Sequence, residues 1–135
     1  MHQSHQLSHA DAMRLIEAVQ QELEKDDRGG AVAIADMHGE LIAFLRTDGC
    51  PLPSINIAIN KAFTAARERR ESKAVGDASR QAGFPMTNFG DIRYTAWGGG
   101  VPIMYQGEVV GAIGVSGLPE ADDMVLAQMA ASLIS

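Results

Sequence analysis

Two pairs of strand-forming segments, each joined by a short glycine-bearing turn, constrain the fold of this chain most strongly. The first pair is AVAIAD at 31–36 and ELIAFLRT at 40–47, on either side of Met37-His38-Gly39. The second pair is VPIMY at 101–105 and EVVGAIGV at 108–115, on either side of Gln106-Gly107. Such pairs predict β-hairpins. Hairpins build antiparallel sheets, whereas neighbouring parallel strands need a long crossover connection.

Helices are expected around these hairpins, because apolar residues recur there at helical spacing. The predicted helices cover 8–26, 54–71, 72–82 and 120–134, and a further short strand is expected at 92–96. The resulting order, α-β-β-α-α-β-β-β-α, favours helices packed on an antiparallel sheet over a doubly wound parallel sheet. The predicted fold class is therefore α+β.

Capping residues mark the expected ends of these helices. Ser8 with Asp11 three residues later predicts a shortened capping box. Gly29-Gly30 offers a left-handed C-cap. Ser54 and Ser72 are expected to cap the second and third helices.

The length of the chain indicates the number of domains, and its composition excludes some classes of binding partner. The 135 residues fit one domain spanning 1–135, with 1–7 as a flexible tail. Seventeen acidic residues against eleven basic ones give a net charge of −6, which argues against nucleic-acid and anionic-membrane binding. No leader segment or membrane span is recognisable, and Cys50 is the single cysteine. These features predict a cytoplasmic protein in a reducing compartment.

The glycine-rich stretches WGGGVP at 97–102 and GAIGVSG at 111–117 are the most unusual parts of the sequence. Glycine weakens a strand, so glycines spaced three apart indicate close approach of either a ligand or another backbone. Both interpretations stay open. Neither stretch has the pattern of a dinucleotide-binding or P-loop motif. On the ligand interpretation, the predicted pocket residues are Gly98, Gly99, Gly100, Pro102, Ser116 and Gly117.

Motifs for nucleophilic or metal catalysis are not recognisable in the sequence. Cys50 has no histidine partner at a recognisable spacing, and His38 stands alone in a turn. The histidines at 2, 5 and 9 are not contiguous, so a polar tail is favoured over a metal-binding tract. No catalytic residue is therefore assigned.

Several segments, taken in order, resemble the GlcG/HbpS family, also called the haem-degrading domain family. They are AVAIADMHGELIAFLRTDG, INKAFTAA, GGGVPI and GEVVGAIGVSG, followed by Asp122-Asp123 and Ala127. They cover about residues 10 to 133, and the chain is also similar to the C-terminal domain of PduO-type corrinoid adenosyltransferases. The resemblance implies a profilin-like fold with an antiparallel sheet of about five strands flanked by helices. It also implies symmetric self-association and, in some members, haem binding.

The first function hypothesis follows from this resemblance: a haem- or tetrapyrrole-binding accessory protein, with haem as cofactor. Family members ligate iron through an N-terminal histidine, and His9 stands in the comparable place as the metal ligand. Lys61 or Arg46 would bind the haem carboxylates. The fallback iron ligands are Tyr94, Tyr105, Met37 and Met104.

Two other hypotheses stay open. The first is a small enzyme or sensor for an organic acid. Lys61 would bind the anion or act as a base, and Asp48 would be an acidic residue that assists it. The second is a non-catalytic subunit that binds a protein partner. The residues do not decide between binding and turnover.

Self-association is also expected from the residues. Hairpins leave sheet edges that must be covered or paired. Ala58, Ala62, Ala65 and Ala66 would allow close helix contact across a symmetric interface. A homo-oligomer of at least two subunits is the prediction.

Overall fold

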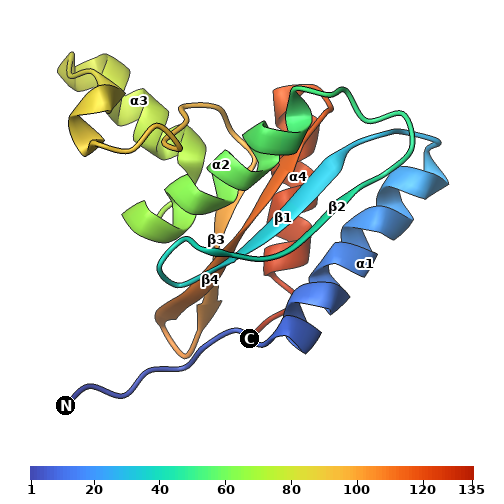
Figure 1. Ribbon diagram of the computed structural model, residues 1–135, viewed down its shortest axis with the longest axis horizontal. Coiled ribbons are helices and arrows are strands. Elements are labelled where there is room, and N and C mark those ends of the chain that lie inside the picture. The colour runs from blue at the N-terminus through green and yellow to red at the C-terminus, as the bar shows by residue number, and fades with distance from the viewer.

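The computed structural model describes residues 1–135 as a four-stranded sheet with helices on both faces (Figure 1). In chain order the elements are α1 (His9–Lys25), β1 (Ala31–Asp36), β2 (Leu41–Arg46), α2 (Ser54–Glu68), α3 (Ser72–Ala82), the 3-10 helix η1 (Met86–Phe89), β3 (Gly100–Tyr105), β4 (Glu108–Ser116) and α4 (Glu120–Ala131). No helix combines the length and the apolar character needed to cross a bilayer.

The sheet has the strand order β2-β1-β4-β3, and all neighbouring strands are antiparallel. The two predicted hairpins lie side by side and join through β1 and β4, where Ala33 pairs with Gly114. The predicted α+β class and antiparallel sheet are confirmed. The edges of the sheet are β2 and β3, one from each hairpin.

The sheet has four strands rather than about five, because the segment 92–96 runs along α2 instead of along a strand. Thr64 on α2 holds this segment at two points. Its hydroxyl donates to the Arg93 carbonyl at 3.3 Å and accepts the Thr95 N–H at 2.9 Å. These backbone groups are thus paired with a helix side chain and not with a neighbouring strand.

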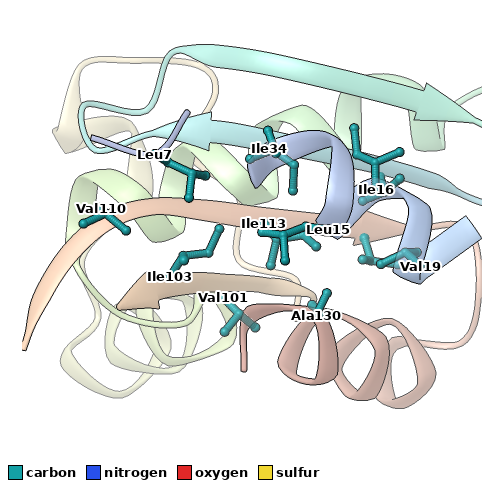
Figure 2. Close-up of a cluster of buried hydrophobic side chains, with 14 of the residues drawn as sticks. Leu7, Leu15, Ile16, Val19, Ile34, Val101, Ile103, Val110, Ile113 and Ala130 are labelled. Carbon is teal, nitrogen blue, oxygen red and sulfur yellow. The ribbon is translucent and has the colours of Figure 1, made fainter. Parts of the chain in front are cut away.

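The larger apolar core lies on the face of the sheet covered by α1 and α4 (Figure 2). Leu15 and Ile16 of α1 pack there against Ile34 of β1 and Ile113 of β4. Successive residues of a strand point to opposite faces, so the large residues of β1 share one face and its alanines the other. Leu7, expected in the tail, is 7% exposed and belongs to this core.

The opposite face is made of small residues and is covered by α2. Ala58 and Ala62 of α2 pack on the alanines of β1, and both are fully buried. A Cβ added at Gly114 would lie 2.1 Å from the Ala58 carbonyl oxygen. Of the two interpretations of the glycines in GAIGVSG, close approach of another backbone therefore holds at Gly114, where that backbone is α2.

This packing corrects the expected role of the alanines on α2. Ala58, Ala62, Ala65 and Ala66 are each 0% exposed within one chain. They face the chain's own sheet, since the glycines of β4 let the helix approach closely. They therefore cannot form a contact between subunits.

The capping predictions are met in part. The capping box of Ser8 and Asp11 is confirmed. After α1 the left-handed position is taken by Asp27, with φ of 52°, and not by a glycine. Gly29 instead lies against another loop, where a Cβ would meet the Gly49 carbonyl carbon at 2.3 Å.

Neither of the two serines expected as caps occupies an N-cap position. Ser54 is the first residue of α2, makes no capping hydrogen bond and follows Pro53 at the N-cap. Ser72 begins α3, and Glu71 takes the N-cap position. The Ser72 hydroxyl donates to the Trp97 carbonyl at 2.7 Å and accepts the Gly100 N–H at 2.9 Å. Ser72 thus anchors the glycine-rich segment before β3.

Candidate functional sites

A buried ion pair joins α2, β4 and α4. The Lys61 ammonium donates to the Asp123 carboxylate at 3.1 Å and to the Val115 carbonyl at 2.9 Å. Both charged side chains are 3% exposed. The other Asp123 oxygen accepts the backbone N–H of Leu118 at 3.1 Å. The pair therefore fixes the start of α4 against α2 and the end of β4.

Burial governs the ionisation of this pair. Removing the Asp123 carboxylate from water raises its pKa, and the attraction and hydrogen bond of Lys61 offset part of that rise. The neighbouring Asp122 carboxylate adds to the rise by like-charge repulsion, while Asp122 itself pairs with Arg28 at 2.8 Å. The net result is a pKa above the usual aspartate value.

The glycines before β3 wrap closely around the pair. Gly99 has φ of +121°, and a Cβ there would lie 2.9 Å from the Lys61 nitrogen and 2.5 Å from the Val115 oxygen. A Cβ at Gly100 would lie 2.2 Å from the Lys61 carbonyl oxygen. The Gly98 N–H donates to the Glu120 carboxylate at 2.8 Å. The Gly98–Gly100 segment thus packs on the chain's own backbone and charged side chains.

A cavity of about 510 Å³ lies beside this ion pair, and we call it the α2–α4 cavity. Its lining residues are Pro51, Ser54, Ile57, Lys61, Trp97, Ser116, Gly117, Leu118, Glu120 and Asp123. The structure thus brings together three of the residues predicted from the sequence, Lys61, Ser116 and Gly117. Of the other predicted pocket residues, Gly98–Gly100 flank the pair without lining the cavity, and Pro102 lies within β3 opposite Ala112.

The sequence interpretation missed three polar members of the cavity. Ser54 was expected as a helix cap, and Glu120 lay in the predicted last helix without a role. Asp123 appears in the sequence only as part of a family segment, and it lies 62 positions from Lys61, with which it forms the buried pair. No spacing rule links residues so far apart, so the sequence carries no local signal for this pair.

A second hollow, which we call the N-terminal groove, has a volume of about 410 Å³. Its lining residues are His5, Gln6, Leu7, Asp11, Arg14, Tyr105, Val110, Leu133, Ile134 and Ser135. The His5 ring meets the Tyr105 ring edge to face, with 4.9 Å between ring centroids. Arg14 is paired with Asp11 one helical turn away. An imidazole, a phenol and a guanidinium therefore share a partly apolar groove.

The residues predicted from the sequence to hold haem are not brought together in one chain. His9 is exposed and begins α1, which at 17 residues is about 25 Å long. Arg46 is exposed and pairs with Ala31, just beyond the other end of that helix. Lys61 lies on α2, which covers the face of the sheet opposite to α1, and it is hydrogen-bonded to Asp123.

The four fallback iron ligands also lie at separate places in the structure, and one of them lines the N-terminal groove. Tyr105 lines the N-terminal groove, whereas Tyr94 stacks on Phe89 at 4.2 Å between ring centroids. Met37, Met104 and the exposed Asp48 line neither hollow. The structure gathers no three His, Cys, Asp or Glu side chains into a group that could hold a metal ion.

Several known proteins are similar to this chain in sequence and fold over most of its length. The family profile described as "Haem degrading protein HbpS-like" matches residues 7–132. Protein GlcG of Escherichia coli K12 is 36% identical over 116 residues, which are 82% of this chain and 81% of GlcG.

Solved structures agree with this match. A double mutant of Streptomyces reticuli HbpS superposes with a TM-score of 0.88 at 30% identity, covering 100% of this chain and 91% of that one. The crystal structure of a PduOC–haem complex superposes with a TM-score of 0.87 at 26% identity, covering 97% and 96%. The matched lengths and identities show that this chain belongs to the HbpS-like family, the family that its sequence motifs resemble.

Proposed function

We propose that this protein binds haem in the N-terminal groove and acts as a haem-handling accessory protein. The observation that carries the proposal is the likeness, over nearly the full length of both chains, to a protein crystallised with haem. The description of the matching family also names haem. Of the two hollows, the N-terminal groove has the side chains that suit haem better than those of the α2–α4 cavity.

Haem needs an axial ligand for its iron, apolar walls for its ring and cations for its carboxylates. In the groove, His5 would ligate the iron, with the Tyr105 ring packed against its imidazole. Leu7 and Val110 would contact the ring, and Arg14 would pair with a carboxylate. When bound, haem would supply a redox-active iron, and these side chains would orient it and exclude water.

The α2–α4 cavity suits haem less well. It has no histidine, and its one cation, Lys61, faces two carboxylates in the same lining, Glu120 and Asp123, which would repel the haem carboxylates. His9 and Arg46 lie at opposite ends of α1, so one haem does not reach both in a single chain. In this proposal His5 therefore takes the place of His9, and Arg14 that of Lys61 and Arg46.

Titration with hemin, followed by absorption, tests the proposal. The wild-type protein is expected to shift the Soret band, and His5→Ala is expected to weaken binding and move the band, because the axial ligand sets the electronic state of the iron. His9→Ala tests the predicted ligand and His38→Ala, in an exposed turn, is the matched control. Both are expected to behave as wild type. The absence of any Soret shift, or a loss in His9→Ala with none in His5→Ala, would count against the proposal.

We also propose that the protein forms a homo-oligomer through an edge of its sheet. The outer sides of β2 and β3 have no strand partner in the chain. Leu41 on β2 is 48% exposed and Met104 on β3 is 43% exposed, so each edge carries an apolar side chain. Light scattering behind a sizing column is expected to give a mass at least twice the 14.4 kDa of one chain. A mass of one chain at micromolar concentration would contradict this.

A further inference from the structure

The buried polar residues of this protein are concentrated at one place. The chain buries six polar or charged residues, which are Ser54, Lys61, Thr64, Ser72, Ser116 and Asp123. Four of these six, Ser54, Lys61, Ser116 and Asp123, line the α2–α4 cavity. Burying polar groups is costly unless they find partners. Their clustering therefore raises the question of what pairs with them.

The serines of the cavity differ from the other buried hydroxyls. Thr64 and Ser72 each make two hydrogen bonds to backbone groups. Ser54 is 6% exposed and Ser116 is 4% exposed, yet neither hydroxyl bonds to another group of the chain. No fully sealed side-chain polar atom lacks a partner, so both hydroxyls open onto the cavity. They are available to whatever enters it.

Lys61 has hydrogen-bonding capacity left as well. An ammonium has three N–H donors. Two of them are used by the Val115 carbonyl and the Asp123 carboxylate. The third has no acceptor among these bonds, and Lys61 lines the cavity together with Ser54 and Ser116. Three hydrogen-bonding groups on two segments of the chain thus line one hollow.

Charge selects the kind of ligand. The lining holds two carboxylates, Glu120 and Asp123, against the one ammonium of Lys61. An anionic ligand would meet like charge there, which disfavours it. An uncharged compound with hydroxyl, carbonyl or amide groups can use the same donors and acceptors without that repulsion.

We propose that the α2–α4 cavity binds a small uncharged compound rich in hydroxyl, carbonyl or amide groups. Ser54, Ser116 and Lys61 are its hydrogen-bond partners, and Trp97, which is 59% exposed, is part of the lining. The volume of about 510 Å³ falls within the usual range for small-molecule sites. The site is independent of haem, because it shares no residue with the N-terminal groove.

Matched pairs of compounds test the charge preference. Trp97 is the single tryptophan, so its fluorescence reports on this cavity without interference. We would titrate the protein at neutral pH with lactamide against lactate, and with malonamide against malonate. The amides are expected to change the emission at millimolar concentration and to bind about 10-fold more tightly than the carboxylates, because like charges oppose each other there.

Two variants test the residues. Ser54→Ala and Ser116→Ala are each expected to weaken amide binding by about 3- to 10-fold, the effect of one lost hydrogen bond. Ser132→Ala, at the end of α4 and outside the cavity, is the control and should bind as wild type. Neither cavity variant should lower Tm, since neither hydroxyl has a partner in the chain. Ser72→Ala should lower it, because that hydroxyl makes two bonds.

The proposal fails on any of three results. They are no emission change with the four compounds at millimolar concentration, tighter binding of the carboxylates, and unaltered affinity in both Ser54→Ala and Ser116→Ala. None of these bears on haem binding, which hemin titration measures separately.

Discussion

Replacing Lys61 by methionine is expected to lower the free energy of unfolding by about 3–5 kcal/mol, the usual cost of removing one partner from a buried ion pair. The Asp123 carboxylate, which is 3% exposed in the wild-type chain, would lose its cation. It would keep the Leu118 N–H as a partner, which satisfies one oxygen and leaves the other beside an apolar side chain. The loss thus comes from an uncompensated charge more than from the missing attraction.

Urea unfolding followed by circular dichroism measures this effect. Lys73→Met is the matched control, because Lys73 forms an exposed i,i+4 pair with Asp77 and should cost about 0–1 kcal/mol. The double variant Lys61→Met with Asp123→Leu is expected to recover much of the loss, since no buried charge then remains unpaired. A loss below about 1 kcal/mol in Lys61→Met would show that the pair does not hold α4 in place.

Replacing Gly114 by alanine is expected to cost about 3 kcal/mol or more, at the upper end of the range for overpacking a close contact. The added Cβ would lie 2.1 Å from the Ala58 carbonyl oxygen and 2.6 Å from the Ala62 nitrogen. These are backbone atoms of α2, so no side chain can turn aside. The helix would have to move away from β4 as a unit, and the alanine layer beneath it would lose its packing.

Gly107→Ala separates this clash from the general cost of replacing a glycine. Gly107 lies in the β3–β4 turn with φ of +78° and no atom within 4 Å of an added Cβ. Its replacement should cost about 1–2 kcal/mol for left-handed strain alone. The same urea measurement compares the two variants. Equal losses would mean that close packing of α2 on β4 contributes little to stability.

The parts of the fold that were predictable are those encoded by local patterns. The turns at Gly39 and Gly107 fixed both hairpins, and the Ser8–Asp11 pair fixed the start of α1. These signals act over a few residues, where turn and capping chemistry decide the conformation. The predicted strand at 92–96 failed because Thr64, about thirty residues earlier, supplies hydrogen bonds that a neighbouring strand would have supplied.

The candidate sites were predictable only in part, because some of their residues meet through contacts between distant parts of the chain. Lys61, Ser116 and Gly117 were recognised from family motifs and glycine spacing, and all three line the α2–α4 cavity. Asp123 joins them through tertiary packing, which periodicity does not encode. His5 lies in a segment with no regular structure, and its place in the groove depends on Tyr105 of the distant β3 strand.

A crystal structure of the protein with haem bound tests the central proposal most directly. The account predicts haem in the N-terminal groove, with its iron bonded to a ring nitrogen of His5 and a carboxylate facing Arg14. Iron bonded to His9 outside the groove, or haem seated beside Lys61 in the α2–α4 cavity, would contradict it.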